Sequence, residues 1–589
     1  MRKILQTLCF AVFALLLIVS RWPLTPGQLF SWDDVNFAYA IGKFDIRVNQ
    51  PQPPGYPVFV LEARMLDWLR VKQAQSNFRI LALLGSAAAL WLVFRVGDLI
   101  LGGYAGFWAA SLMLFYPSFW FAGITSPVRV QLAVVSLAVA GACWHAMKGP
   151  GPWSYWSAIA LGIGAGIRPE LGPLLLPLWL WSVFRGEPSW PRRIAAGGIL
   201  TGAVLAWLVP LVYSAGGLAM FLRTCWLYLS DQASLTSGLF GAASRQVLAT
   251  LCYLAVWAGS GVLAYTLPAL LAWRRKDGFG FNPRQVAFLL IWILPLAGFA
   301  LLVHIGDPGH ALAMVPVVCL VGGRLTDRAV ERWTNELSRF ELVAVVGLLF
   351  GLQALFFEAS HLAQFLLLPA LGLAVGTVRL LQRRYVPGWL PIWQAGVLLL
   401  LPSLCLDAAI FLGQGWYYPA PADSRGIGRF AEQVWSDTNA AVTFSNLDGI
   451  RRVANLDDRV IRQVRTWAAQ RPGATYVVWA DGATIWRKVA YYLPETPIFA
   501  LAVKAASPGA PLALVLAKGS RTQVFSEGHV PLELRVDAGA RLIWILGRRS
   551  GLDTQALARL GAICSGPLCY NDLHDAHGSQ PVGPVTVVW

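Results

Sequence analysis

Two adjacent carboxylates, Asp33 and Asp34, stand in the stretch SWDDVNFAYAIGKF, which begins at Ser31 shortly after the first strongly apolar run of the chain. A carboxylate held beside a reacting hydroxyl can act as a general base, and it can also bind a divalent cation. Adjacent residues on a helix point in different directions, so the two cannot both face one atom. The alternative is structural, because Ser31, Asp33 and Asp34 are all residue types that cap the start of a helix.

Two arginines, Arg129 in TSPVRV and Arg168 in GIRPE, stand at the ends of apolar runs. An ionisable group is costly there and often marks a functional site, although either arginine could instead extend its charge to the lipid headgroups. His304 and His310 flank a Gly-Pro turn, where histidines are more often hydrogen-bonded turn residues than ligands. Taken together, the carboxylates, arginines and histidines predict a site for a phosphate leaving group next to a general base.

The elements that must position these residues are membrane-spanning helices. Hydrophobic residues make up 56% of the 589 residues, 13% are charged and the mean hydropathy is +0.55, whereas soluble domains carry about 25% charged residues. We predict a polytopic α-helical membrane protein with about thirteen transmembrane helices. The apolar runs lie near residues 4–20, 79–97, 104–122, 127–147, 154–167, 171–184, 194–214, 246–272, 286–304, 310–323, 341–357, 361–381 and 389–411.

Basic residues gather in short clusters between the apolar runs, at residues 2–3, 192–193, 274–276, 324–339 and 383–384. This distribution is typical of loops on the cytoplasmic side of a membrane. The net charge of +16 therefore does not indicate nucleic-acid binding. With the N-terminus inside, the segments expected outside are residues 22–77, the turn at Arg168, residues 215–245, residues 304–310 and the C-terminus.

The last part of the chain, residues 413–589, has no apolar run of spanning length. Two stretches have the pattern of buried strands and two have that of amphipathic helices: 474–481 and 540–547, then 423–435 and 459–470. We predict a soluble, external α/β domain that follows a transmembrane domain at 1–412. Cys564 and Cys569 are close in sequence, and in an oxidising exterior we expect them to form a disulfide.

The first external loop resembles that of a known family. An opening apolar run is followed by Trp-Asp-Asp at 32–34, by an aromatic-Ala-Tyr-Ala continuation and by Pro-Pro-x-Tyr at 53–56. This order resembles the GT-C glycosyltransferases, and among them the protein O-mannosyltransferases and the lipid A aminoarabinose transferase. In that group the loop carries an Asp-Glu pair and a later Lys-Pro-Pro-Leu-Tyr segment. The layout of the apolar runs over the transmembrane domain is similar as well.

The resemblance implies a reaction in which a sugar is presented on a polyprenyl phosphate. An acceptor hydroxyl, on a glycan, lipid or protein, attacks the anomeric carbon with inversion, Asp33 accepts its proton and the lipid phosphate leaves. Asp34 would tune Asp33 or hold a divalent metal cation, a cofactor on which relatives differ. Gln52 and Tyr56 would bind substrate. The implied location is the bacterial cytoplasmic (inner) membrane, with the catalytic loop 22–77 and the C-terminal domain facing the periplasm.

The chain departs from the family pattern at four positions, which affects the phosphate-binding role. Asp34 replaces the usual Glu, Gln52 stands at a Lys position, and Asn36 stands where aminoarabinose transferases tend to have a basic residue. Arg129 stands where many relatives carry an acidic residue. We therefore assign the donor phosphate to three other basic residues: Arg168, Arg129 and His310.

Two other classes of function stay open at this point. A transporter or flippase of a lipid-linked saccharide would place ionisable groups near the middle of the bilayer and would often show repeated halves. Here the notable charges lie at the outer ends of the runs and no internal repeat is visible, which favours an enzyme. An outer-leaflet polysaccharide polymerase or ligase would share the lipid-linked donor, and the chain length of its product would distinguish it.

Overall fold

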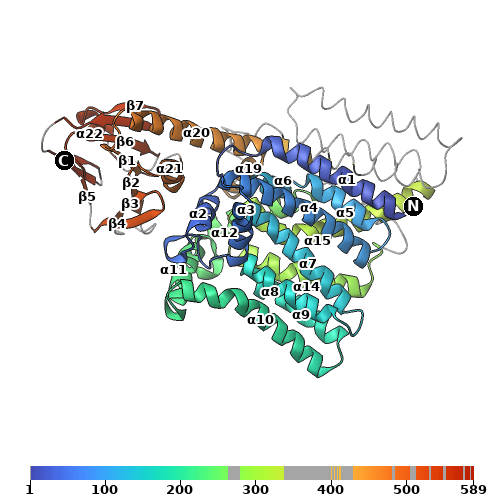
Figure 1. Cartoon of the computed structure of the whole chain (residues 1–589). Coiled ribbons are helices and arrows are strands. Elements are labelled where there is room, and N and C mark those ends of the chain that lie inside the picture. The colour runs from blue at the N-terminus through green and yellow to red at the C-terminus, as the bar shows by residue number, and fades with distance from the viewer. Residues whose placement is uncertain are drawn as a thin grey trace. The chain divides into compact units, whose positions relative to one another are not determined.

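The computed structural model describes residues 2–262, 279–336 and, apart from short gaps, 429–589, together with isolated positions at 269 and between 400 and 412. The chain divides into two compact units (Figure 1). The transmembrane unit comprises Met1–Thr25 and Pro53–Ile450, and the sheet unit comprises Pro26–Gln52 and Arg451–Trp589. Residues 26–52 were expected with the transmembrane domain, but they group with the C-terminal part of the chain.

Helices make up the described part of the transmembrane unit. They are α1 (Arg2–Arg21), α3 (Pro57–Trp68), α4 (Ala74–Ile100), α5 (Ala105–Phe115), α6 (Pro117–Thr125), α7 (Pro127–Ala146), α8 (Trp153–Ile167), α9 (Leu171–Gly186), α10 (Trp190–Ser214), α11 (Leu218–Thr236), α12 (Ser244–Gly259), α14 (Pro283–Leu302), α15 (Val315–Glu336) and α19 (Arg429–Ser445), with short 3₁₀ turns η1 (Trp22–Leu24), η3 (Gly238–Phe240) and η4 (Pro308–Ala313).

Four helices in the described part are long and apolar enough to cross a membrane: α4, α7, α10 and α14. The expected run 104–122 is instead two helices, α5 and α6, bent by 59°. The bend falls at Tyr116 (ψ 123°), because a residue that precedes proline avoids the helical conformation. The runs 341–357 and 361–381 and most of 389–411 lie outside the described residues, as does the end of 246–272.

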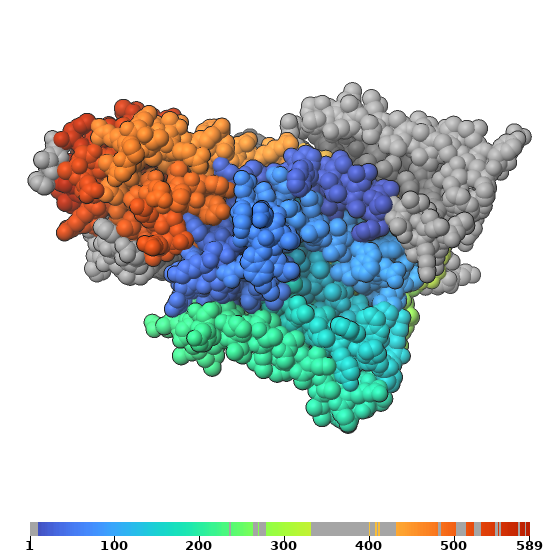
Figure 2. All heavy atoms as spheres, viewed as in Figure 1, coloured from blue at the N-terminus to red at the C-terminus, as the bar shows by residue number. Residues whose placement is uncertain are grey.

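Burial separates the inner helices of the transmembrane unit from the outer ones. In the most apolar stretch of α7, 83% of residues are buried against the rest of the protein, compared with 11% in α10. Figure 2 shows the α10 segment on the surface, and its large apolar side chains, including Ile194 and Tyr213, are exposed. An apolar helix with so little protein cover is suited to contact lipid.

The sheet unit is an α/β domain. Its elements are α2 (Trp32–Gly42), η2 (Ile46–Val48), most of α20 (Leu447–Ala469), β1 (Thr475–Ala480), α21 (Trp486–Tyr492), β2 (Ile498–Val503), β3 (Leu512–Lys518), β4 (Arg521–Gly528), β5 (Leu532–Arg535), β6 (Arg541–Leu546), α22 (Thr554–Arg559), β7 (Ile563–Ser565), β8 (Leu568–Asp572), β9 (Ser579–Val582) and β10 (Val585–Val588). The strands expected at 474–481 and 540–547 are confirmed as β1 and β6.

The main sheet has seven strands in the order β4-β3-β2-β1-β6-β8-β7, and β1 pairs in parallel with both β2 and β6. Alternate side chains of β1 enter two apolar cores. Val477 packs with residues of α20 and α21, whereas Val478 packs toward the second sheet, of order β5-β10-β9. Both faces of the central strands are therefore covered, which explains why they read as nearly continuous apolar runs.

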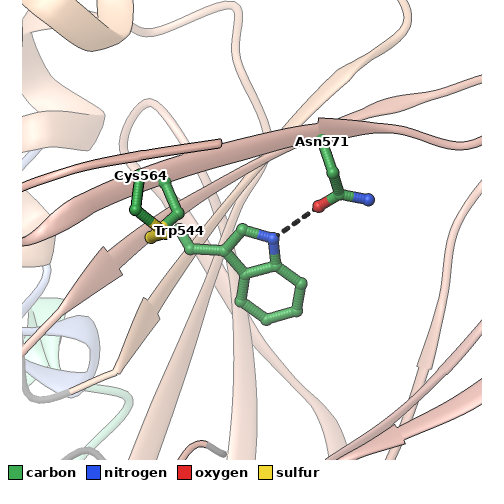
Figure 3. The surroundings of a disulfide bond; sticks show 4 residues. Trp544, Cys564 and Asn571 are labelled. Carbon is green, nitrogen blue, oxygen red and sulfur yellow. Dashed lines mark hydrogen bonds between the residues drawn. A yellow bond between two sulfur atoms is a disulfide. The ribbon is translucent and has the colours of Figure 1, made fainter. Parts of the chain in front are cut away.

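The expected cysteine pair lies on the last two strands at one edge of the main sheet, β8 and β7. Cys564 on β7 stands opposite Cys569 on β8, and the two form a disulfide. Trp544 of the neighbouring β6 is fully buried, and its indole N–H donates to Asn571 Oδ1 at 2.7 Å (Figure 3). The disulfide therefore covalently joins the last two strands of the main sheet.

Candidate functional site

Arg129 and Asp307 form a buried ion pair in the transmembrane unit. Arg129 lies in the first turn of α7, and its Nε and Nη2 atoms each lie 2.9 Å from Asp307 Oδ2. Asp307 caps η4, where its other oxygen accepts the Gly309 N–H at 2.8 Å. A Cβ atom on Gly309 would lie 2.5 Å from the side chain of Arg129, so only glycine permits this approach.

Two histidines adjoin this pair. His310 Nδ1 accepts the backbone N–H of Asp307 at 3.2 Å, and the His304 ring lies 5.1 Å from the His310 ring. Burial, reinforced by the charge of Arg129, lowers the pKa of His310, and burial with His310 and Arg129 lowers the pKa of His304 to about 3. Both imidazoles are therefore neutral at pH 7. Because His310 Nδ1 is an acceptor, its proton is on Nε2.

Arg168 forms the second ion pair, with Glu170. Arg168 ends α8 and is 2% exposed, and its guanidinium carbon lies 4.9 Å from the centre of the Tyr56 ring. Within the described structure its Nε and Nη1 atoms are buried without a hydrogen-bond partner. Leaving two buried donors of a cation unsatisfied is costly, so these atoms are candidates for binding an anion.

The two ion pairs belong to one cluster. Burial tends to raise the pKa of Glu170, but the positive charge of Arg168, with that of Arg129, holds that pKa below its usual value. Burial also tends to raise the pKa of Asp307. The charge of Arg129 and the hydrogen bond with His310 outweigh burial and hold that pKa well below its usual range. We call this group the arginine cluster; its members are Arg129, Arg168, Asp307, Glu170, His304, His310 and Tyr56.

Tyr56 has a left-handed backbone conformation, with φ +48°, and it caps α3 immediately before Pro57. Such a conformation is costly for a residue with a large side chain, and residues of this kind concentrate at functional sites. Here it places the aromatic ring against Arg168. The sequence indicated the two arginines, His310 and Tyr56, but it did not indicate that Asp307 and Glu170 pair with the arginines.

The carboxylates Asp33 and Asp34 lie in the sheet unit, on the first turn of α2. Ser31 is the N-cap, and its hydroxyl accepts the Asp34 N–H at 3.1 Å. Asp34 Oδ2 in turn accepts from the Ser31 N–H and hydroxyl, both at 2.8 Å. This reciprocal arrangement is a capping box. The capping role therefore belongs to Ser31 and Asp34, and Asp33 is not part of it.

Asp34 is almost completely buried, whereas Asp33 is partly exposed. Burial raises the pKa of Asp34 to about 7; the hydrogen bonds from Ser31 oppose this shift and the charge of Asp33 adds to it. Its second oxygen, Oδ1, has no hydrogen-bond partner in the described part of the chain. One oxygen of Asp34 is therefore fixed by two hydrogen bonds, while its second oxygen is buried without a partner in the described residues.

The remaining expected site residues are divided between the units. Gln52 lies at the end of the first segment of the sheet unit, with both amide atoms buried and unpartnered within the described structure, and Asn36 on α2 has the same property. Tyr56 belongs to the transmembrane unit. The described residues contain no group of three or more His, Cys, Asp or Glu side chains arranged to hold a metal ion. Asp34 as a metal ligand stays a prediction.

The comparisons with known proteins come from structure. No family profile and no curated protein sequence matches the chain. The structure of ArnT from Cupriavidus metallidurans bound to undecaprenyl phosphate matches with a TM-score of 0.54 at 14% identity, over 96% of this chain and 97% of ArnT. The apo structure of ArnT matches with a TM-score of 0.52 at 14% identity, over 97% and 98%.

The chain has the fold of ArnT. This confirms the fold class expected from the sequence, a polytopic helical membrane protein with a C-terminal sheet domain. The likeness spans both units, since nearly the whole of each chain is covered.

Proposed function

We propose that this protein is an inverting glycosyltransferase that moves a sugar from a polyprenyl-phosphate carrier to an acceptor hydroxyl at the outer face of the membrane. The observation that carries the proposal is Arg168, a buried cation with two unsatisfied donors inside the arginine cluster. The ArnT structure, whose fold this chain shares, was determined with undecaprenyl phosphate bound, and this supports a polyprenyl phosphate as the ligand.

The arginine cluster is suited to the leaving phosphate. Nε and Nη1 of Arg168 can form paired hydrogen bonds to two phosphate oxygens, and neutral His310 can donate from Nε2. Each arginine already has a carboxylate partner, so the cluster does not carry a large uncompensated charge before the donor binds. Negative charge that develops on the departing phosphate would be stabilised by donors that are already oriented.

Asp33 is the proposed general base, and Asp34 tunes it or holds a cation. The oxygen of the acceptor hydroxyl attacks the anomeric carbon, and its proton passes to Asp33. The bond between the anomeric carbon and the phosphate oxygen breaks, and the carrier phosphate leaves. Asp33 suits this role because it lies on an ordered helix start but outside the capping box that occupies Asp34. The proposed setting is the inner membrane of a bacterium, with both carboxylates on the periplasmic side.

Asp33→Asn tests this role directly. An amide cannot accept the proton at neutral pH, so transfer of sugar from the polyprenyl-phosphate donor should fall by about 10²-fold or more, while membrane insertion and abundance stay at the wild-type level. The matched control is Asp67→Asn in α3, because Asp67 forms a surface ion pair with Lys72. Wild-type transfer by Asp33→Asn would show that the base lies elsewhere.

A further inference from the structure

Lys488 of α21 is a fully buried cation in the sheet unit. Its ammonium group pairs with Asp457 of α20, and their side chains are 1% and 4% exposed. Asp457 also accepts the hydroxyl of Thr484. A buried ion pair is weak grounds for stability, because desolvation of the two charges offsets their attraction. Its better-attested use is to specify one arrangement of the groups around it.

Lys488 binds the backbone just before α2. Lys488 Nζ donates to the carbonyl oxygen of Phe30 at 2.8 Å. Phe30 directly precedes Ser31, the N-cap that forms the capping box with Asp34. A continuous series of polar contacts thus runs from Asp457 through Lys488 to the start of the helix that carries Asp33 and Asp34.

Neighbours of Lys488 on α21 hold the same segment at other points. Arg487 donates to the carbonyl oxygens of Val48 and Asn49, at 2.8 and 3.1 Å. Trp486 makes an edge-to-face contact with Trp32, with ring centres 5.5 Å apart. Three consecutive residues of one short helix therefore contact the beginning and the end of the 26–52 segment.

We propose that Lys488 is a positioning residue for the carboxylates of α2, and that the C-terminal domain is thereby a working part of the catalytic unit rather than an accessory. The proposal rests on the proposed glycosyltransferase function. Lys488 does not touch substrate; it fixes the Phe30 carbonyl, and through it the direction in which α2 begins. Misplacement of a catalytic group by about 1 Å can cost about 10²-fold in rate, so the position of this helix start matters.

The charge of Lys488 gives the proposal a signature that simple loss of packing lacks. The charged and titratable groups around Asp34 are Asp33 on its own helix, Lys488 and Tyr492 on α21, and Asp457 beyond them. Lys488 is the cation of this set, and it opposes the effect of burial on Asp34. Because Asp34 tunes Asp33 in the proposed mechanism, removal of Lys488 should move the acidic limb of the pH–rate profile toward higher pH.

The test is the full-length double variant Lys488→Met/Asp457→Asn, which removes the pair without leaving a buried unpaired charge. We expect kcat to fall about 10- to 100-fold, binding of undecaprenyl phosphate to stay within twofold of wild type, the acidic limb to shift upward and amides at the start of α2 to exchange faster. The matched control is Arg541→Met/Asp572→Asn, which removes another ion pair of the sheet unit. This pair joins β6 to β8, and Arg541 also donates to the carbonyl oxygen of Trp467 on α20.

The control variant should lose stability but keep the wild-type pH profile and the wild-type exchange of α2. If the Lys488 variant behaves like the control, with unchanged kcat, pH profile and α2 exchange, Lys488 is only structural and the proposal is overturned. If the wild-type protein transfers no sugar from any polyprenyl-phosphate donor, the proposed function fails instead, and the exchange of α2 still decides whether Lys488 positions it.

Discussion

Replacement of Asp34 by asparagine should change how the stability of the sheet unit depends on pH. Burial raises the pKa of this carboxyl from 3.8 to about 7. Below the pKa of the unfolded state the carboxyl is protonated in both the folded and unfolded states, and it does not lower the free energy of unfolding. As pH rises through the window between the two values, the unfolded state ionises first and folding is disfavoured. The asparagine side chain of the variant cannot ionise, and its amide oxygen can still accept the two bonds from Ser31.

The expected magnitude follows from the size of this shift. A shift from 3.8 to about 7, at about 1.4 kcal/mol per unit, costs the wild-type unit about 4 kcal/mol above pH 7. The cost should be about 2 kcal/mol at pH 5 and below about 1 kcal/mol at pH 4. The Asp34→Asn variant should therefore be more stable than wild type at pH 8 and nearly equal to it at pH 4.

Hydrogen exchange of the α2 amides measures this difference, because it reports local opening whatever the state of the transmembrane unit. Opening free energies at several pH values are compared after correction for the intrinsic exchange rates. Asp45→Asn in the same segment is the control. The hydrogen bond from Arg47 lowers the pKa of Asp45, so the stabilisation that Asp45 contributes is lost as pH falls, the opposite of the dependence expected at Asp34. Parallel pH dependence in wild type and Asp34→Asn would refute the reasoning.

Three further outcomes are expected. Arg168→Lys keeps the charge but loses the planar fork, so transfer should fall about tenfold, and Arg168→Ala should be worse; equal, near-wild-type activity of both, as expected of the control Arg185→Lys, would contradict phosphate binding. Replacing Cys564 and Cys569 by serine should lower the free energy of unfolding of the sheet unit, measured in denaturant, by about 2 kcal/mol, because the closed loop is short. A reporter fused after Trp589 should be active outside the cytoplasm, and cytoplasmic activity would contradict the topology.

The sequence by itself determined the features that depend on near neighbours. Apolar runs identified the spanning helices α4, α7, α10 and α14, and apolar stretches bounded by turn residues identified β1 and β6. The cap residues of α2 were readable because a capping box involves residues three apart. The 59° break between α5 and α6 was not predicted, although its cause, the proline after Tyr116, is also local.

Only the tertiary structure decided which distant residues meet. The sequence placed Arg129 at the end of an apolar run, but its partner Asp307 is 178 residues away. Lys488 and Phe30 are separated by 458 residues, and their contact places the segment that carries Asp33 and Asp34 in the sheet unit. Periodicity and caps report interactions within a few residues, whereas the pairing of buried charges depends on which elements pack together. The raised pKa of Asp34 has the same origin, because burial is a property of the folded unit.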